Sequence, residues 1–227
     1  MRPGVVISSV VTPAASYNLV DLPTVKLLLG LTDTSRDAML TRAIGDSSTA
    51  AQTFCNNPFV IETVQDQFFP QRDGWPWSLH GQTWAPLQLA RWPIISIASV
   101  VETIGGVATT LTLNTDYLAD KKRGQLTRLQ TYAPGPYPPQ PCNWRSNPIV
   151  AIYQAGYATI PGDVFSAVTY LVKMEYYAQN RDPLVRTQDA SGVFSQSFVM
   201  GTGPGGPGDM PAYAADRLAR YRVPIVA

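Results

Sequence analysis

The chain has 227 residues, which is long enough to bury a sizeable core without disulfide or metal support. Its net charge is +1, and charged residues make up 15% of it, against about 25% in a typical soluble domain. This balance disfavours nonspecific nucleic-acid binding or attachment to an anionic membrane as the main role, and it suits a surface that neighbouring subunits cover.

Residues 1–20 are interpreted as an N-terminal arm. Their apolar run contains Ser8 and Ser9 and is far shorter than the ~18 residues that a membrane span needs, so no membrane contact is expected. A flexible arm or a strand that adds to a sheet is expected instead. Cys55 and Cys142 have no metal-ligand spacing, which favours two reduced thiols in an intracellular protein, with a single disulfide as the alternative.

Residues 21–186 are predicted to form the body, which begins with helical patterns over 21–55. Asp21 can cap a short helix from Leu22 to Leu29, and Gly30 can end it. A longer helix begins among the capping residues at 32–37 and ends near Cys55. Its apolar and small side chains recur every three or four residues and predict one face for core packing: Leu40, Ile44, Ser47, Ala51 and Phe54.

Residues 60–155 change to a β-type pattern and are predicted to form an inserted antiparallel lobe. Gly105 and Gly106 separate two β-branched runs, which predicts a hairpin. The loops at 70–86 and 133–148 are dense in Pro and Trp, and loops of this length usually contact something or are mobile. The expected strands cover 60–69, 92–103, 107–113, 116–118, 124–129 and 149–153.

The last main helix is expected over 161–180, with Asp163 as its cap. Its apolar face should pack against the helix around Ile44; the face is formed by Val164, Phe165, Val168, Leu171, Val172 and Tyr176. Residues 187–227 are predicted to be a flexible C-terminal arm with a short helix from about Pro211 to Tyr221. The whole pattern indicates an α+β fold: a small bundle of three main helices, an inserted antiparallel β lobe and an extended C-terminal arm.

No pattern of catalytic residues stands out, and no cofactor is expected. His80 is the only histidine and lies in a Pro/Trp loop, where a surface position is favoured over a general base. The segment 201–208 lacks the ending of a phosphate-binding loop and is interpreted as a linker. The run Lys121–Arg123 is interpreted as a solvated β-turn.

The Trp-rich loops leave a second function open. Aromatic side chains in long loops are typical of surfaces that bind carbohydrate or a receptor. The residues that suggest such a module here are Trp75, Trp77, Trp84 and Trp144.

The C-terminal segment combines long cationic donors with two apolar anchors three residues apart. An isolated helix of this length is only marginally stable in water, so it needs a surface to fold on. That surface is either a partner molecule or the chain's own body. The candidate partner-binding residues are Arg217, Leu218, Arg220, Tyr221 and Arg222.

The order of these segments resembles that of the head-tail connector, or adaptor, proteins of tailed double-stranded DNA bacteriophages and gene transfer agents. The likeness covers most of residues 20–222 and rests on order and spacing. The matching segments are Leu22–Lys26, Leu29–Leu31, Phe54–Phe59, Leu89–Ile94, Ser99–Glu102, Asp116–Tyr117, Gly124–Leu126, Val150–Tyr157, Ile160–Pro161 and Leu218–Arg222.

The resemblance implies a structural virion protein without catalysis. Such proteins form a ring, commonly of twelve copies, beneath the portal protein, and the ring continues the DNA channel without sequence-specific DNA binding. They also receive a neck, stopper or tail-completion protein. The resemblance therefore places the chain at the head-tail junction of a virion assembled in the host cytoplasm, with its C-terminal arm reaching the portal.

Overall fold

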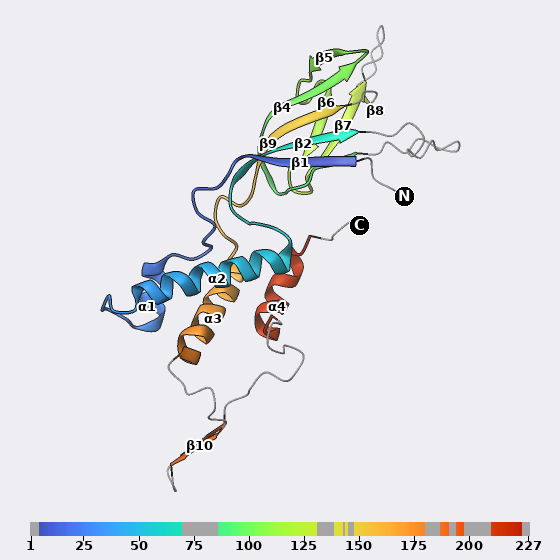
Figure 1. Cartoon of the computed structure of the whole chain (residues 1–227). Coiled ribbons are helices and arrows are strands. Elements are labelled where there is room, and N and C mark those ends of the chain that lie inside the picture. Colours follow the sequence, from blue (N-terminus) through green and yellow to red (C-terminus); the bar gives the residue numbers. More distant parts are fainter. Residues whose placement is uncertain are drawn as a thin grey trace. The chain divides into compact units, whose positions relative to one another are not determined.

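The computed structural model describes residues 5–69, 86–130, 139–142, 144, 148–179, 187–190, 194–197 and 210–223. These residues form helices and antiparallel sheets, so the predicted α+β class is confirmed (Figure 1). The chain divides into two compact units. The β unit comprises Met1–Ala15 and Val60–Ala158, and the helical unit comprises Ser16–Phe59 and Thr159–Ala227.

The described part of the helical unit contains four α-helices and a hairpin. The helices are α1 (Leu22–Leu29), α2 (Asp37–Cys55), α3 (Gly162–Gln179) and α4 (Ala212–Leu218), and α4 continues as the 3-10 turn η1 (Ala219–Tyr221). Strands β10 (Thr187–Ala190) and β11 (Phe194–Ser197) pair as an antiparallel hairpin. This hairpin lies in the segment predicted to be a flexible arm, and sequence analysis missed it.

Left-handed residues end the first two helices. Gly30 has φ 69° and Asn56 has φ 50°, the conformation that lets a chain turn away from a helix. Helix α2 begins at Asp37, within the expected range of 32–37. Helix α3 begins at Gly162, so Asp163 lies inside the first turn and is not the expected cap. An acidic side chain in a first turn still interacts favourably with the helix dipole.

The core of the helical unit lies between α2 and α3, as the apolar stripes predicted. One correction concerns the end of α2, where Phe54 is only half-buried and Cys55 is fully buried. The ion pair between Lys26 Nζ and Asp37 Oδ1, 2.6 Å apart, connects α1 to the start of α2. The buried residues on the two facing helices include Leu40, Ile44, Ala51, Val164, Val168 and Val172.

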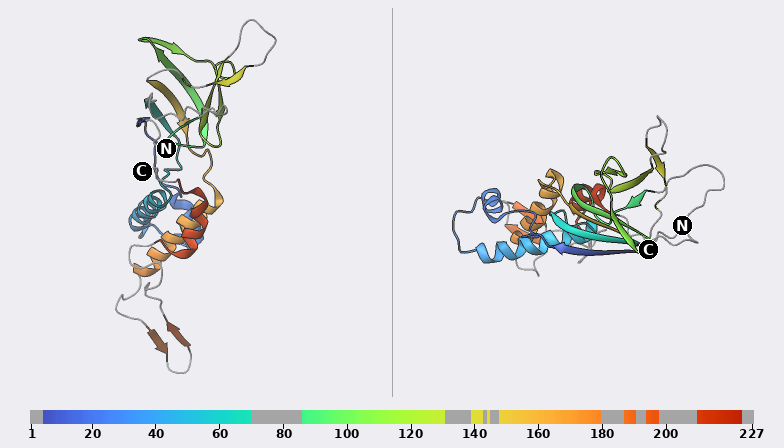
Figure 2. Two further views of the ribbon diagram at one scale, coloured as in Figure 1. Left: turned by 90° about the vertical axis from the view of Figure 1, so that its right-hand side faces the viewer. Right: turned by 90° about the horizontal axis from the view of Figure 1, so that it is seen from above.

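The described strands of the β unit form two antiparallel sheets (Figure 2). The larger sheet has the order β1-β2-β9-β4-β5. Its strands are β1 (Val5–Thr12), β2 (Glu62–Phe69), β4 (Ile94–Ile104), β5 (Val107–Thr110) and β9 (Ile149–Ala155). The smaller sheet contains β3 (Leu87–Gln88), β6 (Tyr117–Asp120), β7 (Gln125–Gln130) and β8 (Gln140–Cys142).

The N-terminal segment forms an edge strand. Of the two expectations for it, a flexible arm or an added strand, the structure shows the strand: β1 pairs antiparallel with β2 from Val5↔Phe69 to Val10↔Val64. The predicted hairpin is also present, because β4 and β5 are joined by Gly105 and Gly106, both with positive φ. A two-residue turn of this conformation matches the right-handed twist of the strands.

Alternating burial along β2 places one row of side chains in the core of the β unit. Val64 and Phe68 belong to a buried cluster with Leu126 and Tyr153, which come from both sheets. Trp144 also lies in this cluster. The same row of β2 buries Glu62 and Asp66, which is unusual for carboxylates and is explained by their partners below.

Candidate assembly surfaces

The predicted partner-binding segment is a folded part of the helical unit. Helix α4 packs on α2 and α3, and Leu218 has no exposed surface. The backbone N–H of Val223 donates to the carbonyl oxygen of Cys55 at 2.8 Å, and the rings of Tyr221 and Phe59 meet edge to face with centroids 5.9 Å apart. Of the two surfaces considered for this segment, a partner molecule or the chain's own body, the structure shows the second, because α2 and α3 supply the apolar contact.

Asp163 in the first turn of α3 holds this segment by its charge. Its carboxylate forms ion pairs with Arg217, at 3.5 Å, and with Arg220, and it accepts a hydrogen bond from the Tyr221 hydroxyl at 3.5 Å. Burial raises the pKa of Tyr221, and the nearby Asp163 carboxylate acts in the same direction. Tyr221 is therefore neutral at physiological pH and acts as a hydrogen-bond donor.

The cations of this segment remain accessible although their helix is packed. The side chain of Arg220 is 61% exposed, and the Arg222 guanidinium lies over the Phe54 ring at 5.4 Å from its centroid. Guanidinium groups held in this way present several N–H donors to carboxylates of another molecule. Of the five predicted residues, Leu218 and Tyr221 pack the helix on its own unit. The three arginines carry positive charge at its surface.

Cys55 is buried beneath the same segment. Its thiol donates to the carbonyl oxygen of Leu218 at 3.6 Å, and it forms no disulfide. Burial raises the pKa of Cys55 to about 11, although the Arg222 cation opposes the shift. Cys142 is also free and buried, in the β unit, so the expected pair of reduced thiols is present.

The helical unit also carries an apolar groove and exposed apolar side chains. The groove has a volume of about 430 Å³ and lies between the middle of α2, the second half of α3 and Pro211; its lining includes Ala50, Leu171, Met174 and Ala178. Outside the groove, the side chain of Leu27 in α1 is 80% exposed and that of Tyr177 in α3 is 62% exposed. Apolar surface of this kind is typical of contact with another subunit.

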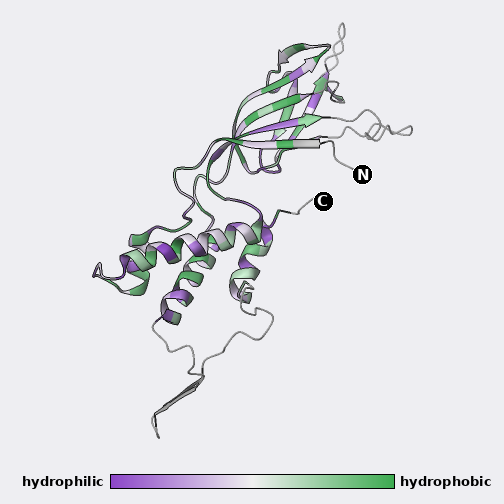
Figure 3. Ribbon diagram, viewed as in Figure 1, coloured by the Kyte–Doolittle hydropathy of each residue, from purple (hydrophilic) through white to green (hydrophobic). Residues whose placement is uncertain are grey.

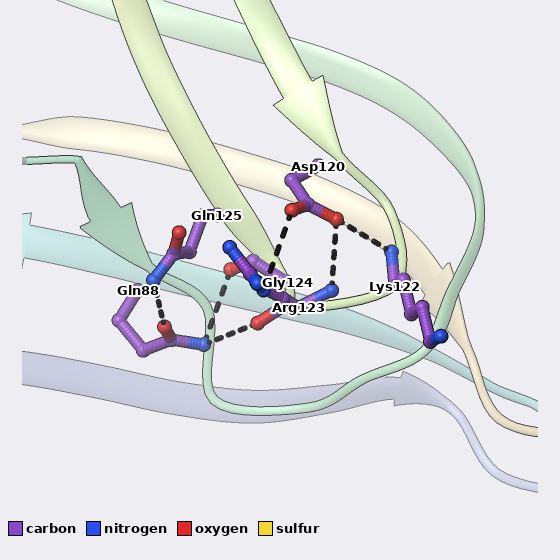
Figure 4. Close-up of polar contacts among 6 residues, drawn as sticks. All are labelled: Gln88, Asp120, Lys122, Arg123, Gly124 and Gln125. Atoms are coloured by element: carbon purple, nitrogen blue, oxygen red, sulfur yellow. Dashed lines mark hydrogen bonds and ion pairs between the residues drawn. The ribbon is translucent and has the colours of Figure 1, made fainter.

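The basic run Lys121–Arg123 forms the expected turn (Figure 4). The Asp120 carboxylate accepts hydrogen bonds from the backbone N–H groups of Lys122 and Arg123, both at 3.0 Å. The Gln88 amide donates to the Arg123 carbonyl oxygen at 2.9 Å and ties β3 to the same turn. These contacts account for the shape of the turn. Its three cationic residues are exposed, although Lys121 donates to the Ile95 carbonyl oxygen and Arg123 lies near Asp120.

Three carboxylates buried in the β unit were missed by the sequence analysis. Glu62 pairs with Arg91 at 2.7 Å and Glu102 with Arg128 at 3.1 Å. Asp66 accepts hydrogen bonds from the Tyr153 hydroxyl at 2.7 Å and from a backbone N–H at 2.8 Å. Burial, followed by the Asp66 charge, raises the pKa of Tyr153. Because Glu62, Asp66 and Glu102 are almost wholly buried, a substrate has little access to them, and their contacts stabilise the fold.

The histidine and tryptophans that the sequence suggested for catalysis or carbohydrate binding form no site among the described residues. His80, Trp75, Trp77 and Trp84 lie outside the described residues. Trp144 is buried in the core, so its expected role in a carbohydrate-binding surface is corrected. Within the described residues there is no group of three or more potential metal ligands, and none of their helices is both long and apolar enough to cross a membrane.

The side of the larger sheet that faces away from its core is here called the outer face, and none of the described residues on it is charged. Cross-strand partners form uncharged rows on it, as in the row from Ile7 in β1 to Thr110 in β5. Hydrophobic and hydrophilic residues alternate along strands of this unit (Figure 3). The outer face includes Ile7, Ser9, Thr63, Gln65, Gln67, Phe69, Ser96, Ser99, Val101, Thr103, Ala108, Thr110, Val150, Ile152 and Gln154. A surface without charges has a small desolvation cost when another protein covers it.

Part of the chain matches the model of a known protein family. Residues 20–74 match the family model described as phage gp6-like head-tail connector protein, and this stretch includes α1, α2 and β2. No curated protein matches the chain. The resemblance to head-tail connector proteins predicted from the sequence is confirmed.

Two solved structures share the fold. One belongs to the neck of an empty gene transfer agent particle computed with C6 symmetry, with a TM-score of 0.51, and the other to the virion of a native gene transfer agent particle, with a TM-score of 0.53. Each is 15% identical in sequence, and each likeness covers 97% of both chains. The likeness therefore extends over both units of the chain.

Proposed function

From the head-tail connector pattern in residues 20–74, and from a fold shared over nearly the whole chain with gene transfer agent proteins, we propose that this protein is a structural connector of a virion. It joins the DNA-filled head to the neck or tail. The family match is the observation that carries the proposal, and the absence of charge on the outer face supports it. Catalysis and a cofactor are not part of the proposed role.

The connector is proposed to be a ring, with twelve copies as the expected number. The ring lies beneath the portal protein, continues the DNA channel without sequence-specific contacts, and receives a neck, stopper or tail-completion protein. Two features support contact between copies: the apolar groove beside Met174, and exposed apolar side chains such as Leu27 on another helix. Twofold contacts do not build such a ring, whereas repeated head-to-tail contacts close one.

The contact with the portal is proposed to involve the C-terminal segment. Leu218 and Tyr221 fix the helix on its own unit, and Arg217 and Arg220 both pair with Asp163, but the Arg220 side chain stays 61% exposed. The exposed Arg220 and Arg222 are then placed to meet portal carboxylates. Repetition around a ring multiplies a weak contact through avidity.

Loss of the protein from the phage or gene transfer agent that encodes it tests the proposed function. We expect DNA-filled heads without attached tails, and cryo-electron microscopy of complete particles should show the chain between portal and tail. Tailed, infectious particles formed without the protein would contradict the proposal. Density for the chain at the tail tip or on the capsid surface would also contradict it.

A paired substitution tests the portal contact. A variant with Arg220→Ala and Arg222→Ala should bind portal-bearing heads at least tenfold more weakly, because two exposed cations are lost. Arg42→Ala is the control, since Arg42 is an exposed arginine on α2. Circular dichroism should show the same helix content in all three proteins. Equal binding by the double variant and the control would remove this segment from the contact.

A further inference from the structure

Both edge strands of the larger sheet lack the charged residues and prolines that commonly protect a sheet edge. Strand β1 has neither a charged residue nor proline between Val5 and Thr12, and every residue from Ile7 to Thr12 is exposed. Its one irregularity lies between Val10 and Thr12, at the end of the strand. Natural edges commonly carry lysine, proline or a central bulge, because a regular edge offers free N–H and C=O groups to another strand.

The opposite edge has the same character. All four residues of β5 are exposed and uncharged, and the side chain of Val107 is 68% exposed. Ile104, at the end of the neighbouring strand, adds further exposed apolar surface. Residues of this β-branched type are favoured in paired strands.

The topology relates these two edges to each other. Each neighbouring pair in the order β1-β2-β9-β4-β5 is antiparallel, and five strands are an odd number. Strands β1 and β5 therefore run in the same direction. Copies related by rotation about one axis, as in a ring, can bring β5 of one copy beside β1 of the next as a parallel pair.

We propose that β5 of one copy pairs with β1 of the following copy, so that the larger sheets join edge to edge around the connector. The proposal rests on the proposed ring and names the strands that connect its subunits. Each contact is head-to-tail, which closes a ring, and it keeps the uncharged outer face on one side of the joined sheet. The main alternative is a twofold pair of two β1 strands, which would stop at a dimer.

Proline substitutions at each edge test the pairing. In a two-residue hairpin closed by Ile104 and Val107, the N–H of Ala108 points away from β4, so Ala108→Pro removes a donor from the free edge and keeps the hairpin. Successive N–H groups of β1 alternate in direction, so either Ser8→Pro or Ser9→Pro removes an outward donor and keeps the bonds to β2. The serine variant whose unfolding temperature equals that of the wild-type chain is the one that keeps its bonds to β2, and it is called the harmless serine variant below.

The full-length chain and these variants would be compared by sedimentation velocity over a concentration series. We expect the wild-type chain to self-associate, and Ala108→Pro and the harmless serine variant to associate at least tenfold more weakly. Ala15→Pro, at an exposed loop residue outside the sheet, is the control and should associate like the wild-type chain. A wild-type chain that stays monomeric, or edge variants that associate normally, would overturn the proposal.

A mixture of the two edge variants distinguishes the possible contacts. The Ala108→Pro chain keeps β1 intact, and the serine variant keeps β5 intact, so the mixture should form dimers and nothing larger. If two β1 strands pair with each other, Ala108→Pro alone will associate normally, which contradicts the proposal. The two proposals can fail separately. Weak association of the edge variants would support the pairing, and absence of the wild-type protein from the head-tail junction of particles would still overturn the connector role.

Discussion

Asp66 in β2 and Tyr153 in β9 form a buried polar contact that also binds the segment between β3 and β4. The Tyr153 hydroxyl donates to Asp66 and accepts a hydrogen bond from the backbone N–H of Arg91 at 3.1 Å. The other oxygen of Asp66, Oδ1, is buried and has no hydrogen-bond partner among the described residues. A carboxylate in this position depends strongly on the donors that it has.

The substitution Tyr153→Phe should therefore lower the free energy of unfolding of the β unit by about 1–3 kcal/mol, because it leaves buried polar groups without a partner. Tryptophan fluorescence during urea unfolding measures this, since all five tryptophans lie within residues 60–158. Tyr177→Phe is the control, because Tyr177 is largely exposed on α3, and it should change the free energy by less than ~0.5 kcal/mol. Equal effects would show that the buried contact contributes nothing.

Cys55 should react with alkylating agents only when the helical unit opens or the pH is high. Its folded pKa of about 11 keeps the thiol neutral at pH 8, and its burial blocks access. We expect peptide mass spectrometry to find little iodoacetamide on Cys55 in the native protein at pH 8 and complete labelling in urea. Rapid labelling of native Cys55 at pH 8 would show that the thiol is exposed.

The same shift predicts a pH dependence of stability. The folded pKa of Cys55 lies above the reference value of 9.0, so the folded state favours the neutral thiol. Its contribution is fully present below pH 9 and is lost as the pH rises to about 11. Thermal unfolding of the wild-type protein and of Cys55→Ser, followed by helix content, should show a steeper loss between pH 9 and 11 for the wild-type protein.

At the scale of elements, local patterns predicted the helices and most strands. The recurrence of apolar residues from Leu40 to Ala51 placed α2 and its buried face, and Gly105-Gly106 placed the β4–β5 hairpin. Buried acids were missed because their partners are distant in sequence: Glu62 needs Arg91 before its burial is favourable. The packing of α4 was left open for the same reason, since Asp163 lies more than fifty residues before Arg220.

The substitution Leu218→Ala tests the packing of α4. Removing a fully buried leucine should lower the free energy of unfolding of the helical unit by about 2–5 kcal/mol through lost burial and a residual cavity. Leu27→Ala is the matched control, because Leu27 is largely exposed on α1 and its truncation should cost little. Both are measured from the helix signal at 222 nm during denaturation. A Leu218→Ala effect as small as that of Leu27→Ala would mean that α4 is not packed in solution.

At the scale of the whole molecule, the division into two compact units predicts two separable unfolding events. Leu218→Ala should shift the transition seen at 222 nm and leave the tryptophan transition unchanged. Tyr153→Phe should do the reverse, because its contacts lie within the β unit. If both probes shift together for both variants, the chain unfolds as one cooperative body.

The uncharged outer face and edges have a consequence for the conditions in which a particle survives. Dissolved salt screens attraction between charges, whereas strand hydrogen bonds and apolar contacts depend on it only weakly. Subunits joined through the larger sheet would keep their association in brine and in dilute buffer alike. Contacts made by Arg220 and Arg222 would loosen as ionic strength rises, so a concentrated salt wash should release the connector from the head as an intact assembly.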